Sequence, residues 1–155
     1  MTPHLTPQDA RRAASLLLLR EGAGGFEVLM MRRAERDGDM RSGACVFPGG
    51  VLDPGDRDAQ RWCLGGDDAA LSRRFGLPEG GLDYAVAALR ETFEEVGLLL
   101  VGQPDGSPFD VATHAAALHG WRERLQRGET SIGALCEAFG VRLDLKVFSF
   151  MPSGL

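Results

Sequence analysis

Short apolar runs separated by glycine-rich turns characterise the N-terminal third of the chain. Residues 13–19 and 26–31 are apolar, and the segment between them contains Glu21-Gly22-Ala23-Gly24-Gly25. Two such runs around a glycine-rich turn predict a β-hairpin. Residues 32–43 are charged and predict a loop, and 44–47 predict a brief strand that ends at Pro48-Gly49-Gly50.

The rest of the chain changes from irregular to helical. Residues 53–81 contain several turn-forming clusters and form the least regular segment, with one short helix predicted at 67–75. Asp83 can cap a helix that runs to Val96 and stops at Gly97. Further elements are expected near the C-terminus: a strand at 98–101, helices at 110–126 and 131–139 (the second capped by Ser131), and a final strand at 141–150.

The helix predicted at 83–96 has two different faces. One is an apolar stripe that we expect to face a core, formed by Val86, Leu89, Phe93 and Val96. Glu91, Glu94 and Glu95 lie on the opposite side, within an arc of about 100°. Arg90 flanks this acidic group, so the sequence predicts a helix with one apolar side and one concentrated negative charge.

Three carboxylates at this spacing repel one another, and a divalent cation with oxygen ligands, such as Mg²⁺, removes the repulsion. Such a metal polarises a phosphoryl oxygen and shields its charge from an incoming water, while one carboxylate stays free to accept the water's proton. The alternative is a solvated acidic face on an amphipathic helix. That is the commoner meaning of a glutamate-rich helix seen alone.

Composition and charge narrow the possible partners. The chain has 155 residues with 44% hydrophobic and 25% charged residues, which suits one domain with a hydrophobic core. Its net charge of -5 gives no sign of a basic surface for nucleic acid or an anionic membrane. The odd set Cys45, Cys63 and Cys136 lacks CxxC spacing, which favours free thiols in a reducing cytoplasm over a disulfide framework or zinc knuckle.

Two segments resemble the Nudix box, the motif of the Nudix hydrolase family. Arg90-Glu91-Thr92-Phe93-Glu94-Glu95-Val96-Gly97-Leu98 resembles its second half, in which Arg-Glu and Glu-Glu pairs precede a glycine and an aliphatic residue. Phe47-Pro48-Gly49-Gly50 resembles the segment that opens the box in many members, and it comes in the order that the family requires.

The first half of the box departs from the family pattern. Leu82 occupies the position, eight residues before Arg90, where the family has a glutamate. Gly50 lies forty residues before Arg90, so we interpret 53–81 as an insertion that interrupts the box. If that insertion folds back, Glu79 is a candidate to replace the missing glutamate.

An interrupted box of this kind resembles the coenzyme A diphosphatases of the peroxisomal type and their bacterial relatives. The segment Leu29-Met30-Met31-Arg32-Arg33-Ala34, followed by Gly43, partly resembles the coenzyme A signature of that group, although Asp39 stands where an arginine is expected. The resemblance implies an α/β fold of the Nudix type, an α/β/α sandwich with a mixed sheet.

The resemblance also implies the roles of the site residues. Glu91, Glu94 and Glu95 are the implied ligands of Mg²⁺ or Mn²⁺, with the backbone carbonyl of Gly50 as a further ligand. Arg90, Glu91 and Glu94 are the implied catalytic residues, one glutamate as the base and the arginine holding a carboxylate in place.

Three upstream residues are candidates for substrate contacts. Arg32 and Arg33 end a predicted strand, and either could grip a substrate phosphate, the alternative being a solvated strand end. Gly49 has no Cβ, which lets the backbone approach metal and phosphate closely.

We expect a flexible N-terminus at 1–12 and a single Nudix-like domain at 13–155. The family fold has further strands and a closing helix after the helical segment, so the domain is expected to lack its last elements. The expected function is metal-dependent hydrolysis of a small nucleoside-diphosphate-linked compound, with coenzyme A or acyl-coenzyme A the best candidate. ADP-ribose or a dinucleotide is an alternative substrate, and an inactive nucleotide-binding domain is an alternative function.

Overall fold

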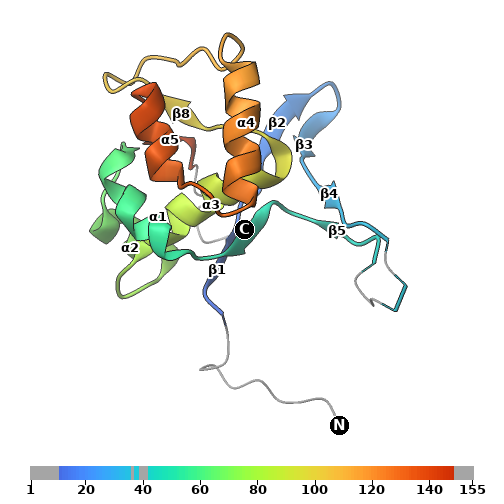
Figure 1. Ribbon diagram of the computed structural model, residues 1–155. Coiled ribbons are helices and arrows are strands. Elements are labelled where there is room, and N and C mark those ends of the chain that lie inside the picture. Colours follow the sequence, from blue (N-terminus) through green and yellow to red (C-terminus); the bar gives the residue numbers. More distant parts are fainter. Residues whose placement is uncertain (1–10, 36, 39–41, 149–155) are drawn as a thin grey trace.

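In the part of the chain that the structure describes, short strands and four α-helices surround one central helix (Figure 1). The computed structural model describes residues 11–35, 37–38 and 42–148. The helices in these residues are α1 (Pro54–Asp58), α2 (Asp68–Phe75), α3 (Gly81–Val96), α4 (Ala115–Gln126) and α5 (Ile132–Phe139). The strands are β1 (Ala13–Ser15), β2 (Leu19–Gly22), β3 (Gly25–Val28), β4 (Met31–Arg32), β5 (Cys45–Val46), β6 (Gly49–Val51), β7 (Cys63–Leu64), β8 (Val101–Gly102) and β9 (Arg142–Asp144). Two short 3₁₀ helices are η1 (Ala59–Trp62) and η2 (Leu145–Val147).

Helix α3 is buried on most of its sides. Of the stripe predicted to face the core, Val86, Leu89 and Phe93 are buried, and Val96 at the end of the helix is half-buried. Thr92, which lies outside this stripe, is also 0% exposed. The reason is that α1, α2, α4, β1 and β6 pack against different faces of α3. The sequence predicted one buried face, whereas the neighbouring elements enclose the helix.

The start of α3 is fixed by α2. Its N-cap residue, Gly80, has a φ of 80° and makes no side-chain hydrogen bond, so the free N–H groups of the first turn need other acceptors. Asp68 accepts from the backbone N–H groups of Gly80 and Leu82 at 3.1 Å and 2.9 Å. The hydroxyl of Ser72 accepts from the N–H of Gly81 at 2.9 Å. With these acceptors available, the helix begins earlier than the sequence predicted.

The strands form three two-stranded antiparallel sheets and one mixed sheet of three strands. In the mixed sheet, β9 lies between β7, which is parallel to it, and β8, which is antiparallel. The predicted hairpin forms from β2 and β3, but β1 leaves it and pairs with β6. The prediction that 13–19 is one strand of the hairpin is therefore wrong for its first residues. The glycines predicted to end a strand belong instead to the partner strand β6.

The segment 53–81 is more regular than predicted. Asp53 caps α1 in a capping box with Asp56, and Pro54 occupies the first turn. Helix α2 lies where it was predicted and ends at Gly76 in a left-handed conformation with a φ of 68°. Because α1 packs against both α3 and α5, the insertion is part of the body of the molecule.

The C-terminal helices are present, with one shifted start. Helix α4 begins only at Ala115, since Asp110 accepts hydrogen bonds from the backbone and hydroxyl of Thr113 and holds a turn there. Ser131 caps α5 as predicted, by accepting from the N–H of Ala134.

The last predicted strands are shorter than expected. Of residues 98–101 only Val101 lies in a strand, β8, and the strand expected at 141–150 is reduced to β9 followed by η2. Residues 149–150, and residues 1–10 of the expected N-terminal segment, lie outside the described residues.

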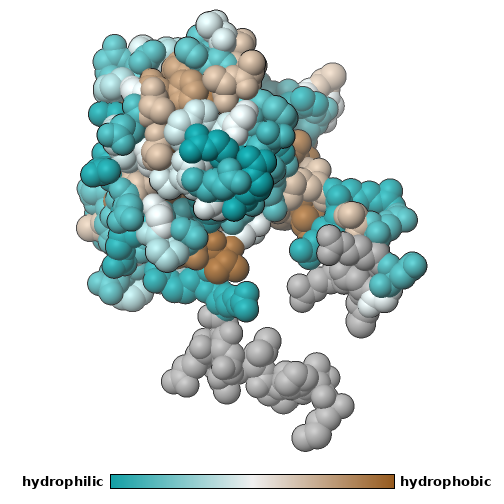
Figure 2. Space-filling model, viewed as in Figure 1, coloured by the Kyte–Doolittle hydropathy of each residue, from teal (hydrophilic) through white to brown (hydrophobic). Residues whose placement is uncertain are grey.

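The architecture is α/β with a mixed sheet, as predicted. None of the helices in the described ranges is long and apolar enough to cross a bilayer. Figure 2 shows hydrophobic surface beside the strands that project from the body, and exposed apolar side chains there include Leu19, Phe26 and Met30.

Candidate active site

A buried arginine, Arg90, links the insertion to the acidic face of α3. Its Nε and Nη2 groups donate to the two carboxylate oxygens of Asp56 at 2.7 Å and 3.2 Å. Nη2 also donates to the carbonyl oxygen of Val51 at 3.1 Å, and Nη1 donates to Glu91 and Glu94 at 3.0 Å and 3.2 Å. A guanidinium group has five N–H donors, so each of them has an acceptor.

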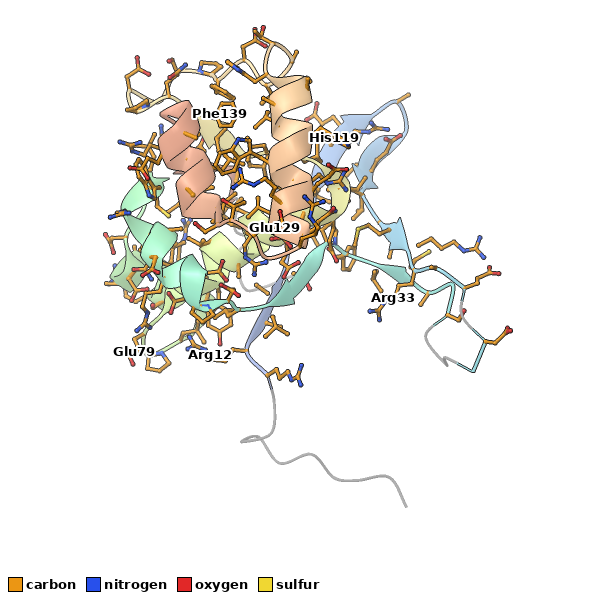
Figure 3. All side chains as sticks on the ribbon, viewed as in Figure 1. Arg12, Arg33, Glu79, His119, Glu129 and Phe139 are labelled. Carbon is orange, nitrogen blue, oxygen red and sulfur yellow. The ribbon has the colours of Figure 1, made fainter. Side chains whose placement is uncertain are left out.

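Asp56 is a residue of the candidate site that the sequence analysis did not identify. Its side chain is 0% exposed, and besides Arg90 it accepts from the backbone N–H of Asp53 at 2.7 Å. A buried carboxylate needs such partners, and the bidentate guanidinium contact is the strongest available to it. The structure places Asp56, not Glu79, against Arg90, while Glu79 is exposed at the edge of the molecule opposite Arg33 (Figure 3).

The signal that could have found Asp56 was only partial. Asp53-Pro54-Gly55-Asp56 has the pattern of a capping box, which indicates the start of a helix. It gives no indication of the ion pair, because Asp56 and Arg90 are separated by 34 residues in the sequence.

The three glutamates of α3 have different partners. Glu91 and Glu94 are half-buried and face Arg90, whereas Glu95 is exposed and accepts from the backbone N–H of Gly49 at 2.8 Å. Burial raises the pKa of Glu94, and the charge of Glu91 adds to this, while Arg90 acts in the opposite direction without cancelling it. Although Glu95 is exposed, partial loss of water around its carboxylate raises its pKa against the lowering effect of the Gly49 N–H.

The Gly49-Gly50 segment runs directly against these carboxylates. A Cβ on Gly50 would lie less than 3.0 Å from the carboxylate of Glu91, which is closer than Cβ atoms in proteins approach other heavy atoms. A Cβ on Gly49 would collide in the same way with the backbone of Ala14 and Ser15 in the paired strand. The backbone of β1 therefore requires glycine at position 49, whereas a Cβ at position 50 would displace the Glu91 carboxylate from the acidic face.

The predicted substrate-binding residues border a cavity next to Glu95. This cavity has a volume of about 400 Å³, and its lining includes Arg32, Arg33 and Gly49. Arg32 donates to Glu35 at 2.6 Å. Arg33 projects from the segment after β4, and its charge acts to lower the pKa of Glu95 (Figure 3).

Another cavity, of about 350 Å³, lies beside a different part of α3. Its lining is mostly apolar and includes Leu16, Phe75, Ala88 and Phe148. None of the three glutamates lines it, so we place the candidate site at the acidic face.

The donor chemistry of the acidic face fits a hard divalent cation, because carboxylate and carbonyl oxygens are the ligands that Mg²⁺ prefers. The oxygens are not yet gathered around one point. Across the described ranges, no group of three or more His, Cys, Asp or Glu side chains is arranged to hold a metal ion. Glu91 and Glu94 face Arg90 instead, and Glu95 faces Gly49.

Comparison with known proteins relates the chain to Nudix enzymes. The acyl-coenzyme A diphosphatase NUDT19 of Gallus gallus is 33% identical over 183 residues, which covers 90% of this chain and 47% of that protein. The acyl-coenzyme A diphosphatase NUDT19 of Homo sapiens is 29% identical over 176 residues, covering 84% of this chain and 46% of that protein. The chain thus spans about half the length of the curated relatives it matches. No protein-family profile matches it.

A solved structure supports the same relationship at the level of the fold. The crystal structure of a NUDIX hydrolase from Alicyclobacillus acidocaldarius superposes with a TM-score of 0.61 at 30% identity, covering 94% of this chain and 64% of that one. By sequence and by fold, the chain is similar to Nudix hydrolases.

Proposed function

We propose that the chain is a metal-dependent hydrolase that cuts the diphosphate of a nucleoside-diphosphate-linked compound, with coenzyme A or an acyl-coenzyme A as the substrate. One observation carries the proposal: Arg90 gathers Glu91 and Glu94 on the face of α3 that the Gly49-Gly50 segment crosses. The similarity to proteins named acyl-coenzyme A diphosphatases supports the choice of substrate.

In this proposal Glu91, Glu94, Glu95 and the carbonyl of Gly50 hold Mg²⁺ or Mn²⁺. When bound, such a cation polarises a phosphoryl oxygen and shields its negative charge from an incoming water. Arg90 keeps two carboxylates on one side of the helix, and Asp56 keeps Arg90 in place. One glutamate is proposed to accept the proton of water through an oxygen that does not bind the cation, and Glu94 is the candidate because it is half-buried against Arg90.

The proposed reaction is a hydrolysis of the phosphoanhydride bond. The oxygen of water bonds to one phosphorus, and the bond from that phosphorus to the bridging oxygen breaks. Each half of the substrate leaves as a phosphate monoester, and the two protons of water are released to Glu94 and solvent. From coenzyme A the products are 4′-phosphopantetheine and adenosine 3′,5′-bisphosphate.

One phosphate of the substrate is proposed to bind in the cavity beside Glu95. Arg32 and Arg33 supply positive charge there, and Gly49 offers backbone that can approach the ligand without steric hindrance from a side chain. Exposed guanidinium groups at the rim also attract an anionic substrate to a chain whose net charge is -5.

The test is metal-dependent turnover of a panel containing coenzyme A, an acyl-coenzyme A, ADP-ribose and a dinucleotide. We expect 4′-phosphopantetheine to appear from coenzyme A with Mg²⁺ or Mn²⁺, and not with a chelator. Glu94→Gln and Glu95→Gln should each lower the rate by about 100-fold or more, since each removes charge where the transition state needs it. Glu123→Gln on α4, an exposed glutamate whose carboxylate lies 3.6 Å from Nε2 of His119, is the matched control.

The other outcomes are equally informative. Preferential turnover of ADP-ribose or the dinucleotide would support the proposed hydrolase activity but contradict coenzyme A as the substrate. Binding of nucleotides in calorimetry with no turnover of any diphosphate would refute the enzyme and favour a binding domain.

We further propose a reducing, cytoplasmic location. The three cysteines of the chain, Cys45, Cys63 and Cys136, are all free thiols. Free thiols are typical of reducing compartments.

A further inference from the structure

The acidic face of α3 lies between two cavities. The first, which we call the arginine cavity, is the one of about 400 Å³ lined by Arg32, Arg33 and Glu95. The second, which we call the loop cavity, has a volume of about 270 Å³ and is lined by Asp53, Glu94, Gln126, Thr130, Ser131 and Ile132, among others. Consecutive residues of α3, Glu94 and Glu95, therefore line different cavities.

The wall of the loop cavity is held firmly to α3. Gln126 at the end of α4 donates from Nε2 to the carbonyl oxygen of Glu94 at 2.6 Å. Arg122 donates from Nε to the same oxygen at 2.8 Å and from Nη2 to the carbonyl of Glu95 at 2.9 Å. These bonds satisfy the last carbonyls of α3 and fix the loop 127–131 next to the carboxylates.

The loop cavity differs from the arginine cavity in charge. Arg90 also lines it, but all five of its N–H donors are engaged by protein acceptors. The remaining charged side chains in its lining are the carboxylates of Asp53 and Glu94. A phosphate or another anion would be repelled by them. The other lining side chains are neutral polar or aliphatic, which suits an uncharged arm that carries hydrogen-bonding groups.

The positions of the two cavities indicate the shape of a substrate that could fill both. A diphosphate bound at Glu94 and Glu95 would lie between the two cavities, so the substituents on its two phosphorus atoms would have separate cavities to enter. A nucleoside triphosphate, with a free terminal phosphate, would leave the loop cavity without a ligand. Its volume of about 270 Å³ also lies just under the usual range for ligand pockets, so it fits a slender arm better than a nucleotide.

We infer that the substrate is a diphosphate esterified at both ends, with its anionic nucleotide in the arginine cavity and an uncharged, amide-bearing arm in the loop cavity. This inference rests on the proposed function and adds which arm lies on which side of α3. Thr130 is then a specificity-determining residue, because it lines the loop cavity and is not the residue that caps α5.

The experiment places a larger side chain in the loop cavity and measures how strongly each half of the substrate still binds. We expect Thr130→Phe to raise the KM for coenzyme A and the inhibition constant of 4′-phosphopantetheine by about tenfold, a loss of about 1.4 kcal/mol of binding. The inhibition constant of adenosine 3′,5′-bisphosphate should change by less than about twofold, within the usual effect of a surface substitution. Glu129→Phe places the same side chain at the neighbouring exposed position, which does not line the cavity, and should leave all three constants unchanged (Figure 3).

A second measurement needs no variant and guards against a Thr130→Phe protein that does not fold. In amide NMR spectra of the wild-type chain, 4′-phosphopantetheine should shift the signals of Gly128 and Thr130, and adenosine 3′,5′-bisphosphate should shift those of Arg33 and Gly49. Shifts from both compounds at the same amides, or a KM unaffected by Thr130→Phe, would overturn the inference. Absence of any diphosphate turnover by the wild-type chain would instead refute the proposed function itself.

Discussion

Replacing Asp56 with alanine tests how the insertion supports the acidic face. The substitution removes the carboxylate that binds two nitrogens of Arg90, and it leaves the guanidinium, whose side chain is only 11% exposed, with unmatched donors. Breaking one side of a buried ion pair costs about 3–5 kcal/mol, because the remaining charge stays buried. For a chain of this size the melting temperature should fall by roughly 6–20 °C.

Two further variants separate the ion pair from the helix cap. Asp53→Ala removes the N-cap of α1 but leaves the Asp56–Arg90 contact, and should cost only about 1 kcal/mol. The double variant Asp56→Leu with Arg90→Met removes both charges, and should recover much of the stability lost in Asp56→Ala. It should nevertheless lose activity, since nothing then gathers Glu91 and Glu94.

Urea and thermal denaturation followed by circular dichroism measure these differences directly. If Asp56→Ala costs no more than Asp53→Ala, the buried pair contributes little and the reasoning is refuted. If the double variant is less stable than Asp56→Ala, the cost does not come from an unpaired charge.

Other predictions concern the frame of the site and the chemistry of its side chains. Gly81→Ala should destabilise the fold by about 1–3 kcal/mol in urea denaturation, because its Cβ would press on the backbone of Ser72; the gain in helix propensity, up to about 1 kcal/mol, is too small to reverse this. The pKa of Asp68 is lowered by the N–H groups it caps, so its contribution to stability is present above its unfolded pKa and is lost as pH falls through the lower folded pKa. Asp68→Asn should therefore flatten the acid side of a stability-against-pH curve, and an unchanged curve would contradict the capping role. Burial raises the pKa of Cys136 to about 12, so in mass spectrometry after brief alkylation the exposed Cys45 should carry the label and Cys136 should react only in denaturant; rapid labelling of Cys136 in the native chain would contradict its burial.

The elements that the sequence predicted well are those set by local signals. Gly97 ends α3 in a left-handed conformation, Ser131 caps α5, and α2 begins after Asp67 and ends before Gly76, as the residue types indicate. In each case the residue that decides the boundary lies within one helical turn of it.

The errors in strand pairing and in the start of α3 come from contacts between distant segments. The strand β1 pairs with β6 across more than thirty residues, and no periodicity in either segment indicates the partner. The same applies to Asp68, which caps α3 from another helix and so lengthens it.

The site was predictable only in part for the same reason. The spacing of Glu91, Glu94 and Glu95 placed them on one face of a helix, because the helical repeat alone determines this. Their actual orientation depends on Arg90, Asp56 and Gly49, which come from three separate segments. The loop cavity was not anticipated, since it forms where the end of α4 meets the capped starts of α1 and α5.

Calorimetric titration of the folded chain with Mn²⁺ tests the central claim, that the glutamates of α3 together bind a divalent cation. We expect saturable binding by the wild-type chain and by the Glu123→Gln control, and a rise in melting temperature with metal concentration. The double variant Glu94→Gln with Glu95→Gln should remain folded and lose that binding. Unchanged Mn²⁺ binding in the double variant, or none in the folded wild-type chain, would contradict the account.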